Sequence, residues 1–287
     1  MSTALVAVQT AIQTQASSDD QMIALWLHGK SPHSQAAYRA DVGRFLVFLG
    51  KPLQAITLGE LQTFCDSLQG AQNSKRRVIS SIKSLYSFAQ KLGYVHFNVA
   101  AALKAPKAKD ELAARILSED QVMAMIHKAT NRRNELILRL LYASGGRVSE
   151  ICRLTWRDLQ TNGESGQVTL FGKGGKTRAV KLSKATWKAL QTFRGEAGPA
   201  MPVFVSRKGG QLDESQVHRI VRAAAQRAGI PGNVSAHWLR HSHASHALDR
   251  GANIAVVRDT LGHGSLAVTS RYTHAKPNES SALHLAI

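Results

Sequence analysis

Apolar residues recur at helical spacing along the first hundred residues. One such stripe runs through residues 38–49, behind a Ser31-Pro32 pair that is typical of a helix start, and Gly50 ends it. The segment 74–92 shows the strongest amphipathic pattern in this half of the chain. The same reading predicts further helices over residues 19–28 and 57–68. Residues 1–18 are rich in Ala, Thr, Gln and Ser, which predicts a flexible N-terminus.

The helical spacing of apolar residues stops after residue 103. Residues 104–114 are charged, contain a proline and lack an apolar face, which predicts a linker between residues 19–103 and 115–287. Beyond it, residues 167–171 and 178–182 alternate like strands around a glycine-rich turn, which predicts a β-hairpin. A capping box at residues 118–121 starts a helix. Other helices are expected at 135–143, after 147, and at 187–193, 216–228 and 235–250, with a short strand or extended piece at 201–206. The fold class is therefore mainly α with a small antiparallel β-sheet or hairpin in the second domain.

The net charge of the chain indicates which kind of molecule it binds. The 287 residues carry a formal net charge of +18, and the pI is about 10.4. Both predicted domains are basic, which suits a protein that grips one DNA duplex from two sides. Cys65 and Cys152 lie far apart without metal-ligand spacing, so a reducing, cytoplasmic interior is expected. The sequence shows no secretory signal and no run of membrane-spanning length, so no membrane partner is expected.

Candidate chemistry gathers near the carboxyl end. On the helix that Ser235 would cap, His237 and Arg240 lie three residues apart and share a face, which suits a phosphate. Tyr272, further along, offers a hydroxyl that can attack phosphorus. Arg147 follows the turn at residues 144–146 and begins a helix, where backbone N–H groups also favour an anion.

Two other kinds of site fit the sequence poorly. Gly175-Lys176-Thr177 matches the end of a P-loop, but Leu170 stands where the first glycine is required, and a strand follows instead of a helix. His237 and His241 have zinc-helix spacing, yet no glutamate lies between them and Arg240 would repel a cation. The sequence therefore predicts no metal and no cofactor.

The motifs taken in order resemble the tyrosine recombinase (phage integrase) family, of the simple two-domain Xer-like type. Residues 144–151 resemble its first arginine box, 172–174 its hairpin lysine, 237–241 and 261–263 its second box, and 272–274 its nucleophile segment. The resemblance is strong over residues 118–276 and loose over 19–103, where it implies a helical, SAM-like core-binding domain. The catalytic residues that it implies are Arg147, Lys173, His237, Arg240, His263 and Tyr272.

The resemblance also implies a role for each residue. Tyr272 would attack a DNA phosphodiester to give a 3′-phosphotyrosyl link, while Arg147 and Arg240 clamp the non-bridging oxygens. Lys173 would protonate the 5′ leaving oxygen. His237 would accept the tyrosine proton or hydrogen-bond the phosphate, and His263 would hold a phosphate oxygen.

Double-stranded DNA is the expected partner, held in a clamp formed by the two domains. A homotetramer on two recombination sites is implied by the resemblance alone, with a monomer or weak oligomer when free, in a prokaryotic or phage context. Gly146 departs from the family pattern, which predicts a looser turn before Arg147, and the tail after Tyr272 is short. The candidate DNA-binding residues are Lys75, Arg76, Arg77, Lys83, Lys176, Arg219 and Arg222.

Two alternative functions remain open on the sequence alone. A type IB topoisomerase-like enzyme would use the same chemistry to relax supercoils without exchanging partners. A non-catalytic DNA-binding protein on the same fold would be expected to lack one of the six catalytic residues, and none is missing.

Overall fold

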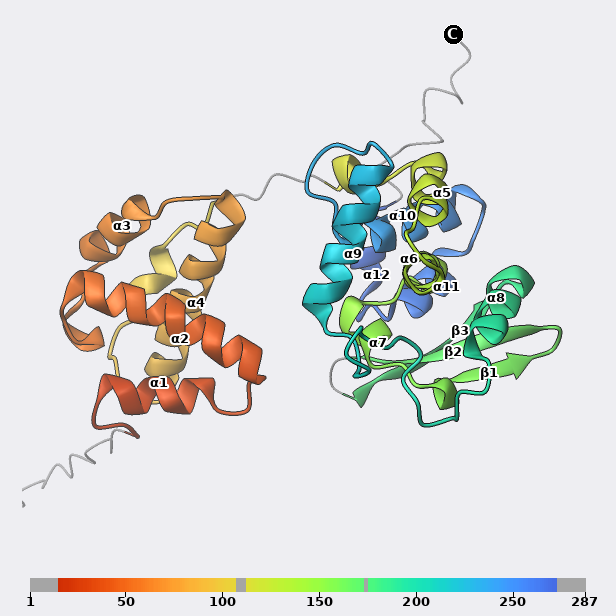
Figure 1. The fold of residues 1–287 in the computed structure, drawn as a ribbon. Coiled ribbons are helices and arrows are strands. Elements are labelled where there is room, and N and C mark those ends of the chain that lie inside the picture. The colour runs from red at the N-terminus through yellow and green to blue at the C-terminus, as the bar shows by residue number, and fades with distance from the viewer. Residues whose placement is uncertain (1–14, 107–111, 173–174, 273–287) are drawn as a thin grey trace, which may run out of the picture. The chain divides into compact units, whose positions relative to one another are not determined.

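The computed structural model describes residues 15–106, 112–172 and 175–272 (Figure 1). The chain divides into two compact units, Met1–Lys109 and Asp110–Ile287. The described elements are mostly helices, with one small antiparallel sheet in the second unit, so the predicted fold class is confirmed.

Among its described residues, the first unit packs four α-helices around an aromatic and aliphatic core. Its elements are α1 (Asp19–Leu27), α2 (Pro32–Leu49), α3 (Leu58–Ser67) and α4 (Gln72–Lys91), with 3-10 turns at Leu53–Ala55 and Val99–Ala102. As predicted, Ser31 caps α2, and Gly50 ends it in the left-handed region at φ 61°. Phe45 on α2 lies edge-on to Phe64 of α3, with ring centroids 5.3 Å apart, and both rings are buried.

The second unit contains eight α-helices among its described residues. They are α5 (Glu119–His127), α6 (Arg132–Ser144), α7 (Val148–Cys152), α8 (Lys184–Arg194), α9 (Glu214–Arg227), α10 (Ala236–Asp249), α11 (Ile254–Leu261) and α12 (Leu266–Ser270), with 3-10 turns at Ala113–Arg115 and Trp156–Asp158. The predicted capping box is present, because Ser118 and Gln121 each bond the other's backbone N–H. Helix α6 is the centre of this core, and its residues 136–138, 140 and 141 are fully buried.

The sheet has the order β1-β2-β3, and both pairings are antiparallel. Strands β2 (Ser165–Phe171) and β3 (Thr177–Leu182) form the predicted hairpin, in register from Gly166 opposite Leu182 to Phe171 opposite Thr177. Strand β1 (Leu159–Asn162) was not predicted, because only Leu159 of its four residues is buried and no alternation appears. Residues 201–206 do not form a strand and pair only through isolated bridges at Pro202 and Val205.

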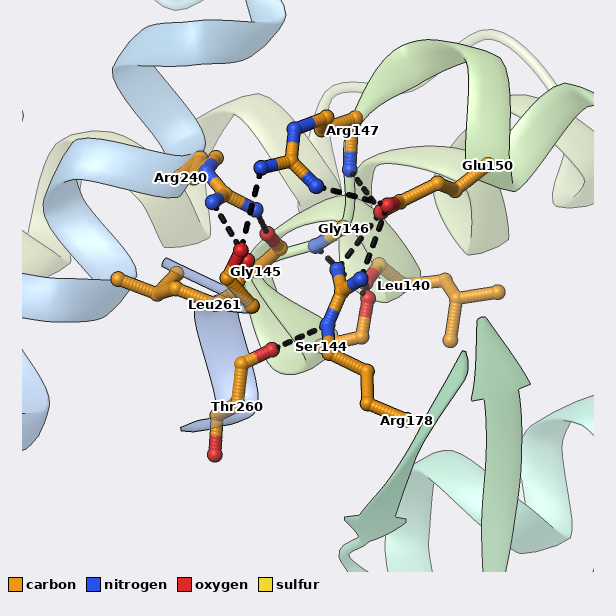
Figure 2. A network of polar contacts seen from close by, with 11 residues as sticks. Leu140, Ser144, Gly145, Gly146, Arg147, Glu150, Arg178, Arg240, Thr260 and Leu261 are labelled. Atoms are coloured by element: carbon orange, nitrogen blue, oxygen red, sulfur yellow. Dashed lines mark hydrogen bonds and ion pairs between the residues drawn. The ribbon is translucent and has the colours of Figure 1, made fainter. Parts of the chain in front are cut away.

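Five elements of the second unit come together at one place. The carboxyl end of α6, the start of α7, strand β3, helix α10 and the carboxyl end of α11 are joined there by hydrogen bonds between their side chains and backbone (Figure 2). Some of these segments, such as those of Arg147 and Gly262, are 115 residues apart in the chain, so the site depends on the packing of the whole unit.

Candidate functional site

A buried carboxylate organises the arginines of the site (Figure 2). Glu150, on α7, accepts the backbone N–H of Arg147 at 2.8 Å and its Nη1 at 2.9 Å. Arg178, on β3, donates from both Nη atoms to the same carboxylate at 2.9 and 2.7 Å. Burial raises the pKa of Glu150, but the hydrogen bonds from Arg178 and Arg147 outweigh it and hold that pKa below the usual range. Glu150 is therefore a charged anchor that fixes two guanidinium groups.

Arg178 also ties the sheet to helix α11. Its Nε donates to the backbone oxygen of Thr260 at 2.6 Å, near the end of α11 and just before His263. The side chain is only 11% exposed. A single residue of β3 thus connects the helix start at Arg147 with the loop that carries His263.

Arg240 is held by the ends of two helices. Its Nη1 donates to the oxygen of Gly145, which ends α6, and its Nη2 to the oxygen of Leu261, the last residue of α11, at 2.5 and 2.6 Å. Helix carboxyl ends carry partial negative charge and favour a cation. Burial, followed by the charges of Arg147 and Arg178, lowers the pKa of Arg240 to about 10, so the group stays charged at neutral pH. It is 4% exposed and rigidly placed.

The turn between α6 and α7 admits no side chain without displacement. Gly145 has φ 58°, and a Cβ there would lie 2.7 Å from Leu261 Cδ2 and 2.9 Å from His243 Cδ2. A Cβ on Gly146 would lie 2.8 Å from Ile151 Cδ1. The expectation of a loose turn at Gly146 is therefore wrong, because the missing side chain leaves room that Ile151 fills.

Tyr272 lies against the helix that carries His237 and Arg240. Its ring is 6% exposed, and its hydroxyl lies 2.8 Å from Nδ1 of His241 on α10. The ring of His263 stacks nearly parallel to it, with centroids 6.5 Å apart, and His263 Nδ1 lies 3.0 Å from Thr269 Oγ1. Burial raises the pKa of Tyr272, and the charges of Arg240 and Arg271 offset only part of that rise.

The histidines of the site are held neutral. Burial, together with neighbouring positive charges that include Arg240, lowers the pKa of His241 and of His263 to about 4 each. His237 is the most open of the three, yet partial desolvation and the Arg240 charge lower its pKa as well. At neutral pH each of these rings can therefore donate one hydrogen bond and accept another.

A cleft of about 460 Å³ lies beside the arginines. Arg147, Lys176 and His263 line it, so three of the predicted residues face one space. Lys173 lies outside the described residues. Its neighbour Gly172 is close to the cluster, because a Cβ built there would meet Glu150 Oε1 at 3.3 Å.

The basic residues predicted on α4 differ in their surroundings. Arg77 pairs with Asp41, a carboxylate that is 1% exposed. Lys83 donates to the backbone oxygens of two residues, 101 and 103, at 2.9 and 2.6 Å. Arg76 is exposed and Lys75 is half-buried. In the second unit, the exposed candidates are Lys176, Arg219 and Arg222.

Sequence reasoning missed two residues of the site. Glu150 had a usable signal, because a glutamate three residues after a helix-starting position commonly bonds back to the backbone there. Arg178 had none beyond its place in the hairpin. The pattern of histidines on this helix predicts that His241 is packed and hydrogen-bonded, and the structure identifies its partner as the Tyr272 hydroxyl.

Within residues 15–106, 112–172 and 175–272, no group of three or more His, Cys, Asp or Glu side chains could hold a metal ion. No helix among these residues is both long and apolar enough to span a lipid bilayer.

Sequence comparisons match both units to one family. Residues 115–279 match the phage integrase family, and residues 22–93 match the phage integrase N-terminal SAM-like domain. A "Tyrosine recombinase XerC" of Xylella fastidiosa (strain M23) is 33% identical over 259 residues, which cover 86% of this chain and 87% of the relative.

Solved structures show the same fold. The crystal structure of XerA recombinase is 28% identical with a TM-score of 0.51, and the match covers 92% of this chain and 94% of that one. The XerH site-specific recombinase bound to difH substrate in a pre-cleavage complex is 20% identical with a TM-score of 0.71, covering 94% and 84%.

Proposed function

The chain belongs to the phage integrase family of tyrosine recombinases, and from that premise we propose that Tyr272 is the nucleophile with which it breaks and rejoins DNA. Attack by the Tyr272 hydroxyl oxygen forms an O–P bond, leaves a 3′-phosphotyrosyl ester and releases the 5′-oxygen. The ester conserves the energy of the phosphodiester, so rejoining needs no nucleotide hydrolysis.

The other site residues stabilise the transition state. Arg147 and Arg240 bind the non-bridging oxygens, where fixed positive groups in a water-poor site are most effective. Glu150 and the helix ends hold these arginines in place before DNA arrives. Lys173, on the hairpin, protonates the 5′-oxygen. His237 and His263 hydrogen-bond the phosphate.

One observation carries this proposal. The Tyr272 ring neighbours the rings of both His241 and His263, with centroids 5.7 and 6.5 Å away, and His241 belongs to the helix that presents His237 and Arg240. The nucleophile and the phosphate-binding groups are therefore in one subunit and in one small region, as direct attack requires.

Strand exchange is the expected outcome rather than relaxation alone. We propose that residues 19–103 form the core-binding domain, which grips the duplex opposite the catalytic domain of residues 115–287. Four protomers would act on two DNA sites, in the cytoplasm of a prokaryotic or phage-infected cell. Incubation with two labelled duplexes that carry the target site should yield recombinant products; relaxed circles alone would favour a topoisomerase. The groups proposed to contact DNA outside the active site are Lys75, Arg76, Arg77, Lys83, Lys176, Arg219 and Arg222.

The central test removes only the nucleophile. Tyr272→Phe should bind DNA normally and form no covalent complex on denaturing gels, because phenylalanine keeps the ring but has no oxygen to attack phosphorus. Arg147→Ala should bind DNA but cleave about 10²-fold more slowly or worse, as for the loss of one oxyanion donor. Covalent complexes with Tyr272→Phe would remove Tyr272 from its role.

A further inference from the structure

We propose that His241 is a catalytic residue that accepts the proton of Tyr272 as the phenol oxygen attacks phosphorus. The inference rests on the proposed function, in which Tyr272 is the nucleophile. It assigns the proton to a different histidine from the one that motif order suggests, and it leaves His237 to hydrogen-bond the phosphate.

Geometry distinguishes the two histidines. Nδ1 of His241 lies 2.8 Å from the Tyr272 hydroxyl oxygen, within reach for direct proton transfer. Among the described residues, His241 is the only one that hydrogen-bonds this hydroxyl. His237 lies one helical turn earlier, and its ring stacks on that of His241 with centroids 6.3 Å apart. Among the described residues, no ring contact or hydrogen bond joins His237 to Tyr272. The proton path from Tyr272 therefore leads first to His241.

The same contacts fit the tautomer that a base needs. Within the described part of the chain, Nε2 of His241 has no hydrogen-bond partner, so it can carry the ring proton and leave Nδ1 bare to accept from the phenol. The groups around the ring are His237 and Arg240 on α10, Arg115 of the 3-10 turn, and Arg271 beside the tyrosine. Their positive charges and burial keep His241 neutral at pH 7, which is the form that a base must have.

DNA binding would convert the hydrogen bond between Tyr272 and His241 into a path for proton transfer. Without DNA, burial keeps the proton on Tyr272 and the site is at rest. A bound phosphodiester brings negative charge beside His241, which favours its cationic form. As the O–P bond forms, the phenol proton becomes strongly acidic and moves to Nδ1, while the P–O5′ bond breaks and the 5′-oxygen takes a proton from Lys173. When the 5′-hydroxyl attacks in the reverse step, His241 returns its proton to the phenol.

The test separates proton acceptance from positioning. In His241→Asn, the side-chain oxygen replaces Nδ1 as an acceptor but cannot take a proton. Single-turnover cleavage of a nicked duplex should fall about 10²-fold or more, with unchanged DNA binding, as for other general bases. Replacing Tyr272 by a fluorinated tyrosine, whose phenol ionises more readily, should restore most of that loss.

Three controls make every outcome decisive. His237→Asn should not be rescued by the fluorinated tyrosine, and a bridging 5′-phosphorothiolate substrate, which needs no acid, should not rescue His241→Asn. Wild-type cleavage by His241→Asn, no rescue by fluorination, or rescue of His237→Asn instead would each overturn the proposal. His241→Gln, closer to histidine in volume, replaces His241→Asn if that variant fails to fold. Failure of the proposed function is distinct, because Tyr272→Phe would then still form covalent complexes.

Discussion

Each unit of the protein carries a group of positive side chains, and the two groups are held differently. In the second unit, the guanidinium groups of Arg178 and Arg240 are almost buried and bonded to Glu150 or to backbone oxygens. On α4 of the first unit, Arg76 extends into solvent and Arg77 remains half-exposed beside Asp41.

The difference separates two uses of positive charge. A cation fixed before the substrate arrives loses little freedom when the transition state forms, which is what catalysis of a charged reaction requires. A cation in solvent is screened and mobile, so it contributes attraction to a polyanion that depends on salt. The same residue types are thus suited to stabilising a charged transition state in one unit and to long-range attraction in the other.

The largest expected effect comes from breaking the buried ion pair between Arg178 and Glu150. Arg178→Met should lower the free energy of unfolding by about 3–5 kcal/mol, because Glu150 loses its main buried partner. Urea unfolding measures this loss, with Arg76→Met as the exposed control at about 0.5 kcal/mol or less. Equal losses in both variants would mean that the two groups do not differ.

The pH dependence of stability provides a second test of the ion pair between Glu150 and Arg178. The folded pKa of Glu150 is lowered, so its stabilisation is present above its unfolded value of 4.5 and is lost as pH falls through the folded pKa. In Glu150→Gln this component is absent at every pH. The stability difference between wild type and Glu150→Gln should therefore shrink below about pH 4.5 and stay constant at neutral pH; urea midpoints at several pH values would measure it.

An intermediate effect is expected at Arg77 of α4, which pairs with the buried carboxylate of Asp41 as Arg178 pairs with Glu150. Arg77→Met leaves Asp41 with only Ser81 and Arg44, at 3.0 and 3.2 Å, as side-chain partners among the described residues. The free energy of unfolding should fall by about 1–3 kcal/mol, as for a buried polar group that loses a partner. Fluorescence of Trp26, the tryptophan of the first unit, follows this transition during urea unfolding. An unchanged free energy of unfolding would mean that Arg77 behaves like a fully solvent-exposed cation.

The smallest effect concerns DNA affinity alone. Lys75→Ala with Arg76→Ala should reduce the slope of log affinity against log salt by about 0.9 for each phosphate contact that is lost. Cleavage at saturating protein should not change, since neither residue belongs to the active site. Lys91→Ala, at the other end of α4, is the matched control, and titrations at several salt concentrations provide the measurement. A slower cleavage step in the double variant would place α4 in the chemistry.

Much of the site was predictable because its signals are local. Arg147 directly follows a turn, and the spacing of His237 and Arg240 puts them on one helix face whatever surrounds them. Glu150 could have been found by the same local reasoning, as a carboxylate one turn into a helix. Arg178 could not, because its partners Glu150 and Thr260 lie 28 and 82 residues away along the chain.

The sequence by itself determined the caps that begin α2 and α5, the glycine that ends α2, the two strands of the hairpin and the candidate residues for chemistry. Capping side chains, glycines and apolar periodicity act within a few residues, so they can be recognised in the sequence without knowledge of the fold. Only the tertiary structure decided that Tyr272 meets His241 and not His237. Helical periodicity defines the faces of α10, but the packing of α11 against α10, and of α12 against α11, selects the face that the tyrosine reaches.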